Sequence, residues 1–407
     1  MLFSFWALSS YAQDLITPVY TSDSISHEFQ LRFQGYYHNQ NVSNDFISLF
    51  YNGGHLDTNL KNQVSEKLHD ENRLGAELVY GIKYKNHSSH LFGKPSWGWY
   101  ASVENIGFYH GEFSKNAFDL VFYGNTRFAG DTTNLSNVNF ESLQYQKLTF
   151  GGFNKTNHSY VGISFLKGQS YRNLKVDRAD LYTAPLGEEI SMNLHANYRQ
   201  SDTLKNGIDA FNGWGLSTDL VFYLNVGKNK NVKFQNAFKI AIQDLGFIQW
   251  NNKSLQTNLD SNYYFNGFEV NDLFDSTSYN FSERIKDSLE VNPIQKTMTT
   301  ALPFSFSFSK IADPNSGEKI QGIYGVRMRA FSNYKPLFFA GIFYQPIKNL
   351  NMNLYTSVGG YGTFRIGYSV YARMIKNMNF SLACNDLLGW SKNGYGKDLT
   401  INLSYAF

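Results

Sequence analysis

Hydrophobic and polar residues alternate with a period of two along most of this chain. The alternation is plainest at the end, where Leu399, Ile401, Leu403, Tyr405 and Phe407 interleave with Thr400, Asn402, Ser404 and Ala406. Such a period is typical of a β-strand with one apolar and one polar face. About ten residues suffice for a tilted strand to cross a bilayer, with its apolar face toward lipid. A half-buried strand of a soluble sandwich alternates too, so the prediction depends on recurrence.

The pattern recurs in sixteen stretches. In the first, Ser26–His38, Phe29 and Leu31 share one side, while Glu28 and Arg32 share the other. The remaining stretches are 73–84, 97–108, 144–153, 159–168, 170–178, 190–200, 214–225, 232–245, 304–308, 320–331, 337–345, 350–358, 362–373, 377–386 and 398–407. The weakest is 170–178, but dropping it leaves an odd number, and bacterial barrels of this type are even-numbered. The sequence therefore predicts an all-β fold, a single transmembrane antiparallel β-barrel of about 14–16 strands, with sixteen favoured and fourteen the alternative.

Three segments interrupt the strands. Residues 39–71 contain Asp57, which can cap a short helix carrying Leu60, Val64 and Leu68 at intervals of four. Long loops are expected near 109–143 and 247–300, and strand parity puts both on the same side. Long loops of such barrels are extracellular, so we expect this side to face the cell exterior.

Residues 1–12 form an apolar stretch that ends in Ser10-Tyr-Ala12, a sequence of the kind that signal peptidase cleaves. A positive amino-terminal region is missing, so we interpret this stretch as a signal peptide with a truncated start; the alternative is a buried strand. Residues 13–407 would then be the barrel, located in the outer membrane of a Gram-negative bacterium. Its last residue, Phe407, is predicted to be the assembly signal.

Composition narrows the classes of function. The 407 residues have 17% aromatics, a mean hydropathy of -0.37 and a net charge of +3, and no apolar run is long enough for a membrane helix. That charge does not predict nucleic-acid binding. A single cysteine, Cys384, excludes an intramolecular disulfide and a cysteine-based metal cluster. The expected partners are outer-membrane lipid and lipopolysaccharide, and other envelope proteins through the long loops.

Recognised catalytic motifs are absent, and the sequence predicts neither a cofactor nor an enzyme. His87 and His90 lie close together, but no carboxylate is placed to complete a metal site. The informative charges are those predicted to face the lumen: Arg32, Glu77, Lys83, Glu104, Asp219, Lys239, Arg327, Arg329, Arg365 and Arg373. They would either line an aqueous pore or pair with one another and with an inserted loop. We favour the second interpretation.

Three predicted strands end alike, with an amide or acidic residue followed by glycine and an aromatic. The sets are Asn105, Gly107 and Phe108; Asp244, Gly246 and Phe247; and Asp386, Gly389 and Trp390. Glycine permits a bend, the polar side chain can satisfy the freed backbone groups, and the aromatic can anchor at a membrane interface. We interpret this motif as a structural device of the barrel rim.

This strand end is similar to that of the fatty-acid-transporter-like superfamily of outer-membrane barrels, which includes members attached to type IX secretion. The strings at 244–250, 55–62 and 213–219 resemble an uncharacterised barrel family from the same bacterial group. The resemblance implies fold and location, and no catalytic residue. Two departures stand out: the lead before the first strand is too short for the transporter's hatch, and the inward positions are polar.

The favoured function is a non-enzymatic accessory or scaffold subunit of outer-membrane secretion or assembly machinery. One alternative is a transporter or channel for small hydrophobic or anionic solutes. The other is an outer-membrane lipid hydrolase.

Overall fold

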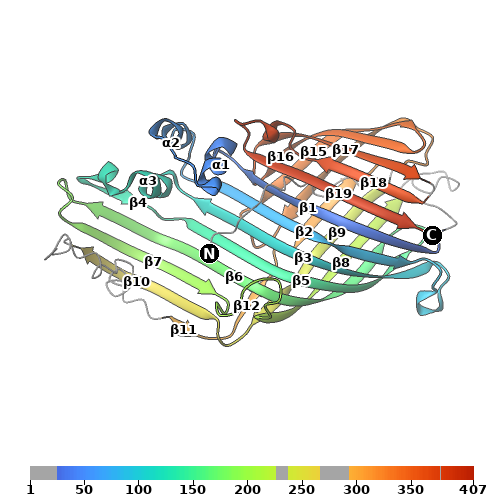
Figure 1. The fold of residues 1–407 in the computed structure, drawn as a ribbon, viewed down its shortest axis with the longest axis horizontal. Coiled ribbons are helices and arrows are strands. Elements are labelled where there is room, and N and C mark those ends of the chain that lie inside the picture. Colours follow the sequence, from blue (N-terminus) through green and yellow to red (C-terminus); the bar gives the residue numbers. More distant parts are fainter. Residues whose placement is uncertain (1–24, 226–236, 266–292, 376) are drawn as a thin grey trace.

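The strands form one closed antiparallel barrel in a computed structural model that describes residues 25–225, 237–265, 293–375 and 377–407 (Figure 1). Fourteen strands make the wall, and β19 pairs with β1 to close it. In order they are β1 (His27–Asn39), β2 (Asn72–Asn86), β3 (Trp97–Phe113), β5 (Val138–Asn154), β6 (Tyr160–Thr183), β8 (Gly213–Asn225), β9 (Ala237–Trp250), β13 (Ser305–Lys310), β14 (Ile320–Arg329), β15 (Lys335–Ile347), β16 (Leu350–Gly360), β17 (Phe364–Ile375), β18 (Met378–Cys384) and β19 (Gly396–Ala406). The all-β barrel is confirmed with fourteen strands, and the favoured count of sixteen is wrong. The predicted signal peptide lies outside the described residues.

The count differs because β6 is a single strand of 24 residues that covers both 159–168 and 170–178. Its pairing with β5 shifts by one residue at Gln169, so β6 carries a bulge there. A bulge breaks the period of two and makes one strand look like two. The stretch 190–200 is strand β7 (Ile190–Gln200), which pairs with β6 and β10 and is not part of the wall.

Strand β6 changes partner along its length. Its first part, Tyr160–Gly168, pairs with β8 in the wall, and its second part, Arg172–Thr183, pairs with β7. Strand β7 in turn pairs with β10 (Leu255–Phe265), and short β4 (Asp131–Asn134) and β11 (Ile294–Gln295) add to the edges. We call this extension of β6, with β4, β7, β10 and β11, the external sheet (Figure 1). Strand β12 (Met298–Ala301) continues the line of β13 along β9.

All but one of the helices in the described residues lie at the same end of the barrel as the external sheet. At that end are α1 (Asn44–Asn52) and α2 (Thr58–Ser65) after β1, α3 (Lys115–Tyr123) and η2 (Asn125–Phe128) after β3, and η3 (Leu388–Trp390) before β19. The exception is η1 (Leu91–Gly93), which follows β2 at the opposite end. The Asp57 side chain accepts a hydrogen bond from the Leu60 N–H and so caps α2 as predicted. Val64 and Leu68 are buried with Phe46 and Phe118 in a cluster that joins the three α-helices, although Leu68 lies beyond the last turn of α2.

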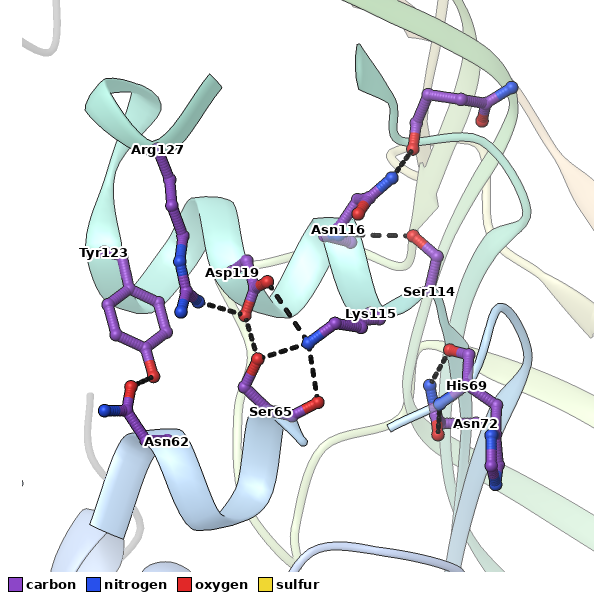
Figure 2. A network of polar contacts seen from close by, with 12 residues as sticks. Asn62, Ser65, His69, Asn72, Ser114, Lys115, Asn116, Asp119, Tyr123 and Arg127 are labelled. Atoms are coloured by element: carbon purple, nitrogen blue, oxygen red, sulfur yellow. Dashed lines mark hydrogen bonds and ion pairs between the residues drawn. The ribbon is translucent and has the colours of Figure 1, made fainter. Parts of the chain in front are cut away.

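A buried carboxylate joins α2 to α3 (Figure 2). Asp119 accepts a hydrogen bond from Ser65 Oγ at 2.7 Å and pairs with Arg127 at 2.9 Å and with Lys115 at 3.6 Å. Lys115 Nζ also donates to the Ser65 carbonyl oxygen at 2.7 Å. Because a buried charge is costly without partners, these contacts fix the two helices to each other.

The two ends of the barrel differ. Loops that carry helices and extra strands follow β1, β3, β6 and β9, which run in one direction, and we call this the loop end. At the other end, Phe407 exchanges backbone hydrogen bonds with His27, and a two-residue connection at 348–349 joins β15 to β16. We call this the terminal end. The two long loops predicted from parity therefore leave the wall at the same end.

The outer face of the wall is an apolar belt. On β14, Tyr324 and Met328 are 48% and 45% exposed, whereas Arg329 is buried toward the lumen. Exposed large apolar side chains of the belt include Phe29, Leu31, Ile82, Val103, Leu148, Phe150, Ile163, Phe222, Phe308, Phe338, Ile342 and Leu354. The predicted alternation of these strands is confirmed. Among the described residues, no helix has the length and apolar character to cross a membrane.

Candidate functional site

A cavity of about 550 Å³ occupies the part of the lumen toward the terminal end. Its walls are the inward side chains of strands from both halves of the chain, and it reaches the rim at Lys155 and Ala406. Eight lysine and arginine residues line it: Arg32, Lys83, Lys85, Lys147, Lys155, Lys239, Arg327 and Arg373. Five acidic residues line it as well: Glu28, Glu77, Glu104, Asp219 and Asp244. The cavity is therefore polar, with an excess of positive charge.

Toward the loop end the lumen is filled by a hydrophobic cluster, which we call the aromatic plug. It consists of Tyr36, Val79, Ile106, Phe108, Leu143, Tyr145, Leu166, Tyr171, Ile248, Trp250, Leu302 and Tyr361, with Met298 and Tyr334 packed against it. Trp250 is fully buried, and its Nε1–H donates to Thr300 Oγ1 at 2.9 Å. Tyr334 also packs on a second cluster that lines β14–β16, including Phe339 and Phe343. The aromatic plug lies between the cavity and the loop end, whereas the second cluster follows the wall as far as Ala312, which comes after β13 at the terminal end.

Lys147 lies at the centre of a buried charge cluster. Its Nζ is 2.8 Å from Asp219 Oδ2 and 2.6 Å from Asp244 Oδ1. Asp244 has a positive φ of 62° at a bulge between β8 and β9, and its N–H donates to Asp219 Oδ1 at 2.9 Å. The bulge turns Asp244 inward, although the alternation Phe238, Ile240, Ile242 would have placed it on the outer face.

The other acids of the cavity are paired too. Glu104 lies 3.6 Å from Arg32, and Glu77 lies 2.7 Å from Arg329. Glu28 lies 3.1 Å from Lys85 and 3.5 Å from His87. Every acid that lines the cavity thus has a cationic partner, and the lumen holds further cations besides these partners.

Eight of the ten charges predicted to face the lumen line the cavity: Arg32, Glu77, Lys83, Glu104, Asp219, Lys239, Arg327 and Arg373. Arg329 does not line the cavity but pairs with Glu77, which does. The Arg329 guanidinium lies 4.8 Å from the centre of the Phe108 ring in the aromatic plug. Arg365 lies apart at the loop end, where it donates to the Gly359 carbonyl oxygen at 2.8 Å. Lys147 was missed, although the outward Leu148 and Phe150 beside it would have placed it inward by parity.

The three similar strand ends lie in different surroundings. Asn105 shares the outer face with Val103 and accepts a hydrogen bond from Gln169 at 3.0 Å. Asp244 points into the lumen, and Asp386 accepts the Gly389 N–H at 2.8 Å in a turn at the loop end.

Their aromatics differ as well: Phe108 is buried in the plug, whereas Phe247 and Trp390 are partly exposed. The prediction of an interface anchor is therefore wrong for Phe108, because its position follows the inward parity of Glu104 and Ile106. Gly107 and Gly246 lie within β3 and β9, next to these side chains.

Comparison with protein families decides the affiliation. The sequence model described as Family of unknown function (DUF5723) matches residues 29–385, which is most of the chain. The chain belongs to this family. No curated protein sequence matches this DUF5723 member significantly.

Several solved barrel structures align with this DUF5723 chain at low similarity. The toluene transporter TbuX of Ralstonia pickettii is 10% identical with a TM-score of 0.39, and 94% of this chain and 89% of TbuX are covered. The toluene transporter TodX of P. putida is 10% identical with a TM-score of 0.37, covering 98% and 95%. The translocator domain of the autotransporter NalP from Neisseria meningitidis is 6% identical with a TM-score of 0.29, covering 95% and 90%. The barrel assignment here rests on the strand pairing of the chain itself.

Proposed function

We propose that this DUF5723 protein is a non-enzymatic barrel of the outer membrane of a Gram-negative bacterium. We propose further that it is an accessory or scaffold subunit of secretion or assembly machinery, and not an open pore. The observation that carries the proposal is a closed wall with an apolar outer belt around a lumen that the aromatic plug fills.

The belt supports the membrane setting. A soluble monomer rarely exposes a contiguous apolar surface of this extent, whereas a closed barrel satisfies its backbone hydrogen bonds and can expose apolar side chains to lipid. Aromatic rings gather on the outer face near the terminal end: Trp99 lies 5.3 Å from Tyr84 and 5.7 Å from Phe150, measured between ring centres. Such a girdle is typical of a membrane–water interface. Lipid and lipopolysaccharide would be the partners of this face.

The plug supports a scaffold role. Tyr36, Phe108 and Trp250 come from distant strands, are at most 3% exposed and belong to one cluster, which leaves no space for water between them in the described part of the chain. At the loop end, the external sheet and the α1–α3 helices form a large surface outside the barrel wall. These would be the contact sites for other envelope proteins, in keeping with the resemblance to barrels attached to type IX secretion.

Conductance tests this proposal. The full chain, refolded and inserted into planar bilayers, should give almost no current. Trp250→Ala and Tyr36→Ala each remove a ring from the plug and should raise the conductance, whereas Phe222→Ala on the outer face should not. Steady large conductance steps from the unaltered protein would contradict a filled lumen.

Orientation is tested separately on intact cells. An epitope inserted at Lys392, between β18 and β19, should bind antibody without permeabilisation. The same epitope at Asn349, between β15 and β16, should bind only after the outer membrane is broken. The reverse pattern would invert the proposed topology.

A second candidate function is a transporter for small anionic solutes. The excess of lysine and arginine over acids in the cavity favours it, because such a field attracts anions. Anion-selective current through the unaltered barrel would favour this function over the scaffold.

A further inference from the structure

One row of inward side chains crosses five adjacent strands of the cavity wall. Arg373 on β17 is paired with Asn379 on β18, which is paired with Ser404 on β19. Ser404 is paired with Gln30 on β1, and Gln30 with Lys83 on β2. All five side chains line the cavity, and Asn379 Nδ2 donates to Ser404 Oγ at 3.1 Å.

The chemistry of this row suits an anion that also carries hydroxyl groups. A guanidinium and an ammonium group stand at its two ends, and two amides and a hydroxyl lie between them. Lys83 Nζ lies 5.3 Å from the centre of the Tyr100 ring and 5.6 Å from that of Tyr160, so two ring faces help to hold the ammonium group in place. No acidic residue belongs to the row.

Electrostatics point the same way. Lys83 shares the inward face of the wall with Lys85 on its own strand and with Arg32 on the neighbouring strand, and like charges so placed repel one another. The acids of the cavity are already engaged in the ion pairs described above. Because Arg32 and Lys85 already have acidic partners, a bound anion would supply the counter-charge that Lys83 and the other cations of the cavity attract.

We propose that the cavity binds a hydroxylated small molecule with two or more phosphate or carboxylate groups. Its volume of about 550 Å³ is within the range of small-molecule sites. The row extends over four strand spacings, about 19 Å along the wall, which is too long for one phosphate group. The aromatic plug closes the loop end, so the ligand enters from the terminal end. This site does not depend on whether the barrel conducts.

Calorimetric titration of the full refolded chain in a zwitterionic detergent tests the site, with fructose 1,6-bisphosphate as the probe and sucrose as the neutral control. We expect the bisphosphate to bind, sucrose not to bind, and added salt to weaken the binding. Lys83→Gln should weaken it about tenfold, the effect of losing one charged hydrogen-bond donor. The matched variant Lys253→Gln, which removes an exposed lysine at the loop end, should not change it.

Arg373→Gln at the other end of the row provides a second variant should Lys83→Gln fail to fold, and it too should weaken binding about tenfold. Absence of binding to the unaltered protein would overturn the site, as would equal affinities of Lys83→Gln, Arg373→Gln and Lys253→Gln. A conducting barrel that still binds the bisphosphate would overturn the scaffold function alone. A non-conducting barrel that does not bind it would overturn only this inference.

Discussion

Replacing Lys147 by methionine should destabilise the barrel by about 3–5 kcal/mol, the cost of removing one partner from a buried ion pair. The Lys147 side chain is 5% exposed, and it is the cation between Asp219 and Asp244. Methionine has a similar length and fills the space, so the loss is one of charge. Two carboxylates would then face each other across a poorly solvated site, held together by the bulge at Asp244.

The magnitude can be divided by combining variants. Asp219→Asn alone should cost less, about 1–3 kcal/mol, because Lys147 keeps Asp244 and an asparagine oxygen can still accept the Asp244 N–H. Adding Asp219→Asn and Asp244→Asn to Lys147→Met removes all three charges, so most of the lost stability should return.

The free energy of unfolding is measured by urea titration of the protein refolded in lipid, followed by tryptophan fluorescence and extrapolated linearly to zero urea. Lys310→Met is a control, because Lys310 does not line the cavity and donates to the Gly322 carbonyl oxygen at an exposed position. A loss below about 1 kcal/mol for Lys147→Met, or a triple variant no more stable than the single one, would refute the reasoning.

Three further predictions follow from the wall and its extension. Val326→Arg puts a charge on the lipid face at a cost of about 2–4 kcal/mol, so it should impair folding into bilayers far more than Arg327→Ala on the lumen side; the opposite ranking would shift the register of β14 by one. Phe407→Ala should reduce insertion in cells while Thr400→Ala is tolerated, and equal insertion of both would contradict an assembly signal at Phe407. Burial raises the pKa of the Glu141 carboxyl, in the β5 segment that joins the external sheet, to about 7. Because this folded pKa lies above the unfolded value of about 4.3, stability should fall as pH rises from about 4 to about 7, and Glu141→Gln should flatten that slope in unfolding titrations; an unchanged slope would contradict the assignment.

The sequence was sufficient to predict the faces of most wall strands. On β14, Tyr324 and Val326 face outward and Arg327 and Arg329 face inward, as the alternation predicts. This succeeds because the side-chain period of a strand is two wherever no bulge intervenes.

Bulges are where prediction failed. The extra residue at Gln169 made β6 look like two strands, and the bulge at Asp244 turned that side chain into the lumen. Asp244 belongs to the motif that predicted a bend, but the sequence does not tell which residue of a bend is the extra one, and Gln169 carries no such signal. Two strands too many were therefore predicted for the wall. One came from counting β6 twice, and the other from β7, which alternates like a wall strand although it lies outside the wall.

The ion pairs were also beyond the sequence. Parity places Glu77 and Arg329 on the inner surface, but it does not tell which strand lies opposite which, nor at what height each residue lies along the barrel axis. Arg365 shows that height along the barrel axis is not predicted: inward parity alone grouped it with the other lumen charges, but it lies at the loop end. Only the pairing registers, with strand tilt and closure, decide such positions.

Strand β6 passes without interruption from the wall into the external sheet, and this has a mechanical consequence. The residues from Asp177 to Thr183 extend about 23 Å beyond the last pair with β5, at a rise of about 3.3 Å per residue. A stiff hydrogen-bonded arm of that length acts as a lever whose fulcrum is the barrel rim. A partner protein that binds the far end of this arm would exert a torque on the whole barrel and tilt it in the membrane. Such a signal would need no solute to pass through the lumen.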